Sequence, residues 1–200
     1  MGLRAGTRAI ILAAGAGSRL RDVAALKPLA PVGGRPLLLH ALDSLAAAGV
    51  EAATVVTGRG ADAIEAALKG APIPVETVFN PDWAAAPNGV SVLAARGGLG
   101  VRTVLMMADH LVEPALVERL LADAPAQGLA LAVDRRLGSP LVDEADVTRV
   151  RTDADGRIRA IGKDLLVYDC YDTGVFLVGE ELMAALATLR APGLSDGVRV

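Results

Sequence analysis

The chain has 200 residues, a mass of 20.4 kDa and a formal net charge of −3, which suits one domain with a sizeable core. Hydrophobic residues make up 52% and charged residues 22%, which excludes intrinsic disorder. The mild acidity and the 2% of aromatic residues argue against nucleic acid as a partner. The single cysteine, Cys170, excludes an internal disulfide and a multi-cysteine zinc site.

The hydropathy pattern indicates no targeting or membrane segment in this sequence. The longest apolar stretch, residues 37–50, is interrupted by His40, Asp43 and Ser44 and falls short of the roughly 18 residues needed to span a bilayer. The N-terminus lacks the apolar core and cleavage pattern of a signal peptide. We therefore expect a cytoplasmic domain with no membrane contact through this segment.

The first two thirds of the chain alternate between short apolar runs and amphipathic stretches. The runs are typical of buried parallel strands, and the stretches place apolar residues at helical spacing. Gly49 and Gly70 end two of the helices, and Asn88 could cap a third. The predicted strands cover residues 9–14, 53–57, 75–79, 103–107 and 129–133, and the predicted helices cover residues 36–48, 62–69, 88–96 and 113–123.

The pattern changes after residue 140. Residues 147–151, 158–161 and 171–178 have the character of short strands around a turn at 153–156. The alternation before this point predicts an α/β fold with a doubly wound, mostly parallel, Rossmann-like sheet and helices on both faces. We expect the later strands to form a small antiparallel addition in the C-terminal third of a single domain, residues 1–200.

A glycine-rich turn follows the first predicted strand. Backbone N–H groups of such a turn can approach phosphate oxygens closely, and Arg19 and Lys27 add fixed positive charge beside them. Leu20 replaces the third glycine of a dinucleotide loop, and the Gly-Lys-Ser/Thr of a Walker loop is absent, so an ordinary tight turn is the alternative. The candidate nucleotide-binding residues are Leu12, Ala13, Ala14, Gly15, Ala16, Gly17 and Ser18.

This turn carries a family resemblance. Leu-Ala-Ala-Gly-x-Gly-x-Arg over residues 12–19, followed by Lys-Pro-Leu at 27–29 and Gly-Arg-Pro-Leu at 34–37, resembles the signature of the nucleoside-triphosphate transferases, the sugar-1-phosphate nucleotidyltransferases. The resemblance spans nearly the whole chain. It implies that the loop binds the triphosphate, and that Arg19 and Lys27 stabilise the transition state and the departing pyrophosphate.

Later motifs resemble one branch of this family. Residues 80–83 and 88–91 are similar to the base-binding segment of cytidylyltransferases acting on small alcohol phosphates, which implies base or ribose contacts for Asn88, Gly89 and Ser91. The alternative for Asn88 and Ser91 is a helix cap and its first-turn neighbour. The succession of later motifs is similar to inositol-1-phosphate cytidylyltransferases, including the form fused to a membrane-embedded CDP-alcohol transferase domain.

Asp109 is the candidate metal ligand. It follows a purely apolar strand, and an open α/β sheet binds its ligand at the carboxyl ends of its strands. A carboxylate there can hold Mg²⁺, the role that the resemblance implies, whereas the alternative is a turn or capping residue. The neighbouring His110 could orient Asp109 or contact substrate hydroxyls.

The acceptor substrate is assigned to the C-terminal third. The resemblance implies that Lys163 grips the acceptor's phosphate, and the alternative is an ordinary surface lysine. In the Asp172-Thr173-Gly174 motif, Asp172 could bind acceptor hydroxyls. We expect Trp83 and Cys170 to be packing residues.

The resemblance implies Mg²⁺-dependent transfer of CMP from CTP to a small phosphorylated alcohol, with inositol 1-phosphate as the first choice, giving a CDP-alcohol and pyrophosphate. Phosphocholine and hydroxyethyl- or aminoethylphosphonate stay open as acceptors, as does uridylyl or thymidylyl transfer to a sugar 1-phosphate. A non-catalytic nucleotide-sensing domain and a Rossmann oxidoreductase are alternatives from other classes. The oligomeric state is unreadable from the sequence.

The end of the chain carries one more expectation. The family normally continues past the Asp-Thr-Gly strand to a segment whose aspartate supplies a second metal ligand. Residues 195–200 resemble instead the first turn of a helix capped by Ser195. We therefore expect a truncated sequence, with the second ligand encoded beyond Val200.

Overall fold

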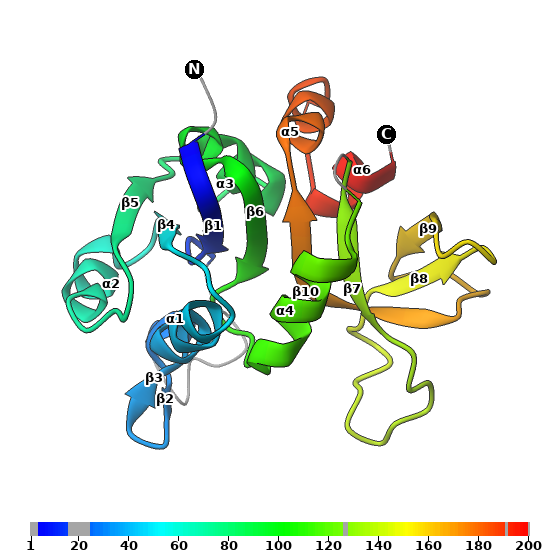
Figure 1. Cartoon of the computed structure of the whole chain (residues 1–200), viewed down its shortest axis with the longest axis horizontal. Helices are drawn as coiled ribbons and strands as arrows, with labels where there is room; N and C mark the ends of the chain where they lie inside the picture. Colours follow the sequence, from blue (N-terminus) through cyan, green and yellow to red (C-terminus); the bar gives the residue numbers. More distant parts are fainter. Residues whose placement is uncertain (1–3, 16–24, 126–127, 191, 200) are drawn as a thin grey trace.

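The computed structural model describes residues 4–15, 25–125, 128–190 and 192–199 (Figure 1). Its main sheet has eight strands in the order β5-β4-β1-β6-β10-β8-β9, with β7 paired to β10. β5, β4, β1 and β6 are parallel, whereas β10 runs antiparallel to β6, β7 and β8. The bounds are β1 Arg4–Leu12, β4 Ala52–Thr57, β5 Val75–Phe79, β6 Gly100–Met107, β7 Ala130–Asp134, β8 Arg149–Thr152, β9 Ile158–Gly162 and β10 Cys170–Val178.

Helices cover both faces of this sheet. The strands alternate in side-chain direction, so that Ile11 packs into one core cluster and Ile10 into the other, both without exposed surface. The first face packs against α1 (Leu37–Ala47), α2 (Ala61–Leu68) and α4 (Pro114–Asp123), and the second against α3 (Asn88–Ala94), α5 (Glu180–Ala187) and α6 (Leu194–Arg199). The predicted doubly wound, mostly parallel sheet is therefore confirmed.

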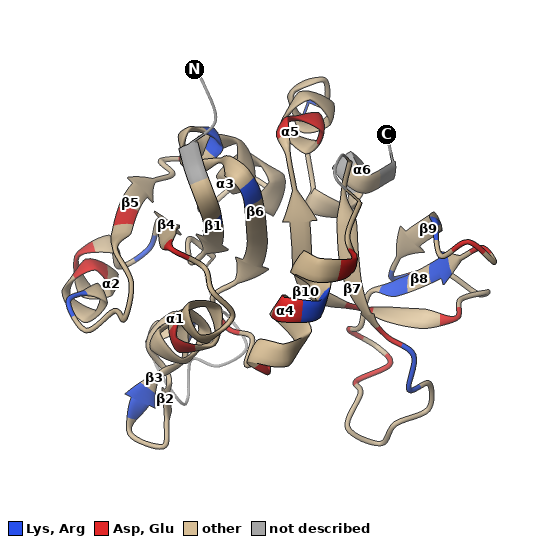
Figure 2. Ribbon diagram, viewed as in Figure 1, with Lys and Arg blue, Asp and Glu red and all other residues tan. Residues whose placement is uncertain are grey.

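The antiparallel addition of the C-terminal third is also confirmed. β8 pairs with β9, and a small third cluster of Val150, Ile161 and Cys170 forms beneath them. Arginine positions, coloured blue in Figure 2, occur on both strands: Arg149 and Arg151 on β8 and Arg159 on β9.

One strand joins the two parts of the sheet. Residues Val175–Val178 of β10 pair with β6, while Cys170 and Tyr171 pair with β8. Between them Gly174 adopts a φ of 73°, a left-handed conformation that favours glycine, where the register with β7 shifts. The strand can therefore bend from one part of the sheet to the other.

The structure differs from the sequence predictions mainly in short elements. A hairpin of β2 (Pro31–Val32) and β3 (Arg35–Pro36) turns through Gly33 and Gly34, both at positive φ, and a 3₁₀ turn, η2 (Lys27–Leu29), precedes it. The helix α5 was not predicted. The helix predicted from Ser195 begins at Leu194, so Ser195 is not its cap.

No helix in the described ranges combines the length and the apolarity that crossing a membrane requires.

Candidate nucleotide-binding site

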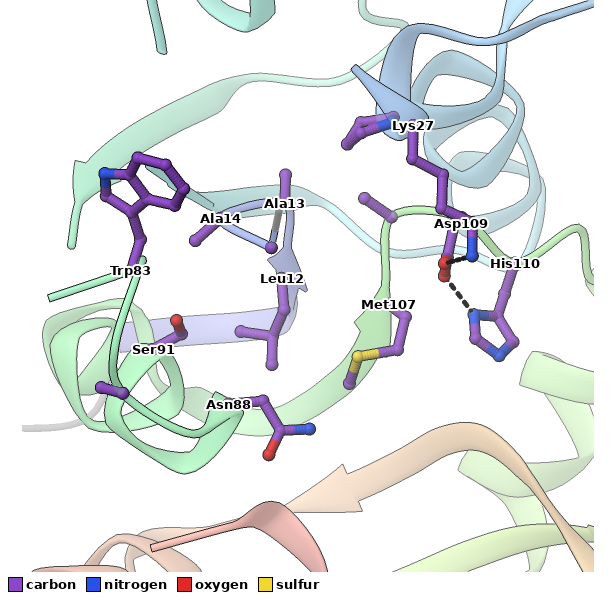
Figure 3. Close-up of a pocket in the computed structure, with 14 residues that line it drawn as sticks. Leu12, Ala13, Ala14, Lys27, Trp83, Asn88, Ser91, Met107, Asp109 and His110 are labelled. Atoms are coloured by element: carbon purple, nitrogen blue, oxygen red, sulfur yellow. Dashed lines mark hydrogen bonds and ion pairs between the residues drawn. The ribbon is translucent and has the colours of Figure 1, made fainter. Parts of the chain in front are cut away.

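A pocket of about 330 Å³ opens at the carboxyl ends of β1 and β6 (Figure 3). This edge of an open α/β sheet is where ligands usually bind, because the loops after the parallel strands diverge there. The lining residues are Leu12, Ala13, Ala14, Gly15, Lys27, Pro28, Trp83, Ala86, Asn88, Ser91, Met107, Ala108, Asp109 and His110. Many of the predicted site residues thus meet in one place.

The Asp109 carboxylate lies between two cationic or hydrogen-bonding partners. Lys27 forms an ion pair with Oδ2, and Nδ1 of His110 lies 2.7 Å from Oδ1. The sequence brings Lys27 here on η2, whose first turn begins at that residue, while Asp109 and His110 follow β6 directly. The side chain of Asp109 is 22% exposed, so it remains accessible from the pocket.

These neighbours decide the charge state of Asp109. Burial by itself raises the pKa of the carboxyl, but the hydrogen bonds and positive charges of His110 and Lys27 outweigh it and hold the pKa well below its ordinary value. Asp109 is therefore ionised at neutral pH, as a ligand for a cation must be.

The donor set fits a hard divalent cation that also contacts substrate. Within the described ranges, no three His, Cys, Asp or Glu side chains form a cluster able to hold a metal by themselves. Mg²⁺ commonly binds through one or two carboxylates plus substrate phosphates and water, and Asp109 supplies one such carboxylate.

The α3 wall of the pocket is built by buried hydrogen bonds. Nδ2 of Asn80 donates to Oγ of Ser91 over 2.9 Å, and Asn80 is 1% exposed. Oδ1 of Asn88 accepts from the backbone N–H of Leu194 over 2.9 Å. The suggested capping role of Asn88 is wrong: Pro87 occupies the N-cap position, and Asn88 is the first helical residue.

Two residues in this wall differ from their expected roles. Gly89 does not line the pocket, and a side chain there would overlap with the backbone carbonyl of Pro192, so its small size serves packing against the C-terminal segment. Trp83, expected only to pack, lines the pocket and also rests on Gly58, where a Cβ would lie 2.6 Å from that of Trp83. Its position in the sequence between Asn80 and Asn88, two residues of the segment similar to a base-binding segment, was the signal that could have placed Trp83 in the pocket.

The Asp172-Thr173-Gly174 motif reaches the site through His110. A Cβ on Gly174 would lie 2.9 Å from Nε2 of His110, so the glycine makes room for the imidazole. Burial raises the pKa of Asp172, partly offset by the N–H of Gly174, which donates to its carboxylate, and by His110. Oγ1 of Thr173 donates to the carbonyl of Ala132, which ties β10 to β7.

Lys163 lies apart from these residues. It follows β9, is absent from the pocket lining, and its ammonium pairs with Asp146 at 2.5 Å. The predicted residues Ala16, Gly17, Ser18 and Arg19 lie outside the described ranges.

The fold and the pocket define a class of protein. The backbone of residues 13–15, a lysine and an ionised aspartate lie together at the carboxyl ends of the parallel strands of a doubly wound sheet, an arrangement that suits nucleoside phosphates. The chain is a Rossmann-like nucleotidyltransferase domain. The family model of the MobA-like NTP transferase domain matches residues 9–190. The chain therefore belongs to this family.

Curated relatives share much of this sequence. A protein of Rubrobacter xylanophilus named bifunctional IPC transferase and DIPP synthase is 40% identical over 185 residues, covering 92% of this chain and 41% of that protein. The CMP-5′-(3-aminopropyl)phosphonate synthase of Streptomyces rubellomurinus is 40% identical over 153 residues, covering 74% and 23%. The chain thus spans about two fifths of the first relative's length and less than a quarter of the second's.

Solved structures show the same architecture. The inositol-1-phosphate CTP transferase of T. maritima superposes with a TM-score of 0.85 at 25% identity, covering all of this chain and 81% of that one. UDP-glucose pyrophosphorylase bound to UDP-glucose gives a TM-score of 0.79 at 16% identity, covering 99% and 86%, which supports the fold alone.

Proposed function

We propose that this domain transfers CMP from CTP to a small phosphorylated alcohol, with inositol 1-phosphate as the preferred acceptor, releasing a CDP-alcohol and pyrophosphate. The observation that carries the proposal is the ionised Asp109 beside Lys27 at the mouth of a nucleotide-sized pocket. The choice of CTP and inositol phosphate is supported by the names of the Rubrobacter relative and the T. maritima structure.

Catalysis in this proposal is positioning and charge stabilisation. The acceptor's phosphate attacks the α-phosphorus of CTP in line with the departing pyrophosphate, and a phosphate dianion needs no general base. Lys27 and the backbone amides after β1 neutralise the charge that develops on the leaving group, together with Arg19. His110 holds the Asp109 carboxylate in place through its 2.7 Å contact.

Asp109 would hold Mg²⁺, which supplies polarisation of the phosphoryl oxygens when bound. We assign the acceptor to Lys163 and to the Asp172-Thr173-Gly174 motif of β10. In this assignment the ammonium of Lys163 exchanges its contact with Asp146 for the acceptor's phosphate. Asp172, half-buried beside His110, offers an oxygen to a hydroxyl group.

A turnover matrix tests this function. Four nucleotides (CTP, UTP, dTTP and GTP) are combined with four acceptors (inositol 1-phosphate, phosphocholine, 3-aminopropylphosphonate and glucose 1-phosphate), and pyrophosphate release is measured. We expect the highest rate with CTP and inositol 1-phosphate. Turnover of UTP or dTTP with the sugar phosphate, but none of CTP, contradicts the proposal, and nucleotide binding without any release identifies a sensor.

A phosphonate acceptor is the second candidate. The 40% identity to an aminopropylphosphonate-activating enzyme favours it, and a phosphonate presents the same attacking oxygens as a phosphate ester. Phosphocholine stays a further acceptor that the matrix tests. The acceptor arms of the matrix separate these cases.

Two further predictions concern the cell compartment and a fused domain. The cytoplasm stays the expected compartment, which localisation of a tagged full-length protein checks. Fusion to a membrane-embedded CDP-alcohol transferase domain also stays a prediction, and the gene sequence downstream of Val200 checks it.

A further inference from the structure

The loop that carries Lys163 is held by contacts to its backbone. Residues 163–169 form turns and bends between β9 and β10. The side chain of Lys163 is 53% exposed, so packing alone does not fix where its ammonium lies. Because the four-carbon side chain of a lysine is flexible, a lysine that binds a phosphate at a defined place needs a fixed backbone.

Arg149 provides these contacts from β8, the strand next to β9 (Figure 1). Nη1 of its guanidinium donates to the carbonyl oxygen of Lys163 over 3.2 Å and to that of Leu165 over 3.4 Å. The guanidinium stays charged and can only donate, and carbonyl oxygens can only accept. One arm of Arg149 therefore fixes the backbone of the residue proposed to bind the acceptor.

The other arm of the same guanidinium binds the loop before β8. Nη2 donates to the carbonyl oxygen of Glu144 over 3.1 Å and to its carboxylate over 3.2 Å. Asp146, in the same loop, contacts the ammonium of Lys163 at 2.5 Å. Residues 144–149 thus hold Lys163 both at its backbone and at its ammonium group.

Two tyrosines keep Arg149 in place. The hydroxyl of Tyr171 donates to one carboxylate oxygen of Glu144, and the hydroxyl of Tyr168 donates to the other over 3.4 Å. The guanidinium carbon of Arg149 lies 5.0 Å from the centroid of the Tyr168 ring, a cation–π contact. The hydrogen bond from Tyr171 and the charge of Arg149 outweigh burial and hold the pKa of Glu144 below its ordinary value. Glu144 is therefore an ionised partner for Arg149 at neutral pH.

The same network is tied to the other residue proposed to bind the acceptor. Tyr171 pairs with Arg149 in the ladder between β10 and β8, and it directly precedes Asp172. The N–H of Asp172 donates to the carbonyl of Thr148 over 2.9 Å. Thr148 and Arg149 are consecutive, so one short piece of chain sets the position of Lys163 relative to Asp172.

We propose that Arg149 is a positioning residue for the acceptor substrate: its guanidinium holds the backbone of Lys163 where the ammonium meets the acceptor's phosphate. The inference rests on the proposed function and deepens it, since it names the group on which the action of Lys163 depends. Both arms of the guanidinium bind protein oxygens, so Arg149 acts without touching the substrate.

Arg149→Lys is the main variant. It keeps the positive charge near an anionic acceptor, but an ammonium cannot present two arms to two loops. We expect the KM of the whole chain for inositol 1-phosphate to rise about tenfold, because a displaced binding group loses contact. The KM for CTP should stay unchanged, since Lys27 and Asp109 lie on other segments. Pyrophosphate release at varied concentrations of each substrate measures both constants.

Arg151→Lys is the matched control. Arg151 is exposed, lies two residues further along β8 and is paired with Ala160 of β9. The same exchange at this position should leave both KM values unchanged. A loss of folded protein in Arg149→Lys lowers kcat alone, whereas a misplaced Lys163 raises the KM for the acceptor.

A double-mutant cycle tests whether Arg149 acts through Lys163. Lys163→Met removes the ammonium, and we expect it to raise the KM for inositol 1-phosphate about tenfold to a hundredfold. In that background Arg149→Lys should change this KM by less than about twofold, because no ammonium is left to be misplaced. A residue that bound the acceptor directly would show its full effect in both backgrounds.

Glu144→Gln decides the question if Arg149→Lys does not fold. It keeps the shape of a side chain that is 45% exposed and removes the charge that holds the guanidinium. We expect the KM for inositol 1-phosphate to rise about threefold to tenfold. Loss of a negative charge would by itself favour an anionic substrate, so this rise has the opposite sign to a simple charge effect. An unchanged or lowered KM overturns the inference.

The outcomes separate the inference from the proposed function. A raised KM for the acceptor in Arg149→Lys, absent in Arg151→Lys and in the Lys163→Met background, supports the inference. An unchanged KM in Arg149→Lys, or a full effect in both backgrounds, overturns the inference and leaves the proposed function standing. An unchanged KM in Lys163→Met overturns the assignment of Lys163 and the inference with it. A wild-type protein that releases no pyrophosphate from CTP with inositol 1-phosphate overturns the proposed function and the inference together.

Discussion

At the scale of single residues, the Asp109 carboxylate is organised before substrate arrives. One oxygen contacts Lys27 and the other His110, so both orientation and ionisation are set by neighbours on separate segments of the chain. A group that is already oriented and charged needs little rearrangement when phosphates bind, which is the main source of rate enhancement in phosphoryl transfer.

Replacement of Asp109 tests this organisation. Asp109→Asn keeps the shape but removes the negative charge that Lys27 and a cation require, so we expect pyrophosphate release to fall roughly a hundredfold or more. The matched control is Asp62→Asn on α2, away from the pocket, which should retain activity. Near-normal turnover in Asp109→Asn, with an unchanged circular dichroism spectrum, would contradict the assigned role.

Asp169 provides a pH-dependent case. Hydrogen bonds from the hydroxyl and the N–H of Thr152, each 2.6 Å, and the guanidinium of Arg135 lower the pKa of Asp169 from 3.8 to about 2. The folded state therefore binds this proton less readily than the unfolded state. The stabilisation is complete above about pH 4 and is lost as the pH falls through about 2.

We expect Asp169→Asn to lower the free energy of unfolding by about 1 kcal/mol at neutral pH, a value reduced for solvent screening because the side chain is 39% exposed. The difference from wild type should shrink as the pH is lowered from about 4 to about 2. Urea unfolding across this range measures it, and a difference independent of pH would argue against the assigned hydrogen bonds.

The sequence predicted the individual site residues unevenly. Gly15, Lys27 and Asp109, which line the pocket, could be found because strand ends and fixed charges leave local patterns. The role of Gly89 could not, because its close neighbour, Pro192, lies over a hundred residues away in the chain. The place of Trp83 in the pocket lining could not be predicted either. It depends on how the segment of Trp83 packs against Gly58, which lies in another loop.

At the scale of elements, α3 is held by the C-terminal segment. Asn88 binds the start of α6, and Gly89 lies against Pro192, so the pocket wall and the end of the described chain form one packed unit. α3 begins without a side-chain cap because its N-cap residue is Pro87, whose side chain has no hydrogen-bonding group.

A methyl group at position 89 should break that contact. Gly89→Ala places a Cβ against the carbonyl of Pro192, a backbone group that cannot turn aside, and we expect a loss of about 1–3 kcal/mol in unfolding free energy. Gly70→Ala is the control, since its Cβ would meet Leu39 at an ordinary 3.5 Å. Denaturant unfolding compares the two, and equal stabilities would show that α3 and the 192–194 segment do not pack as described.

Long elements were predicted better than short ones. The helices α1 and α4 were predicted to within one residue at each end, because their apolar periodicity is strong. The β2–β3 hairpin has two residues per strand and offers no periodicity to detect. The helix α5 was missed although Gly179 and two glutamates mark its start.

At the scale of the whole molecule, two helical layers and a sheet enclose most of the apolar surface, while β8 and β9 keep a small cluster of their own. Cys170 lies in this third cluster with no exposed surface, and its thiol contacts the carbonyl of Val150 at 3.7 Å. Burial raises the pKa of the thiol, which further suppresses the reactive thiolate.

Cys170 should therefore report the opening of the antiparallel addition. We expect no reaction of the native protein with an aromatic disulfide reagent at neutral pH, and full reaction of its single thiol after unfolding in urea. Following the colour change at increasing urea gives the stability of this part of the fold. Rapid, complete labelling of the native protein would show that the third cluster is not closed.

The strand β10 belongs to both parts of the sheet. Its carboxyl half pairs with β6. Its amino half pairs with β8, which lies within residues 135–169, through Cys170–Val150 and Tyr171–Arg149. The proposed acceptor ligand Lys163 lies in this segment, on the far side of β10 from the strands that carry the pocket. We expect that replacing residues 135–169 by those of a phosphonate-activating relative changes the acceptor that is used more than the nucleotide that is bound.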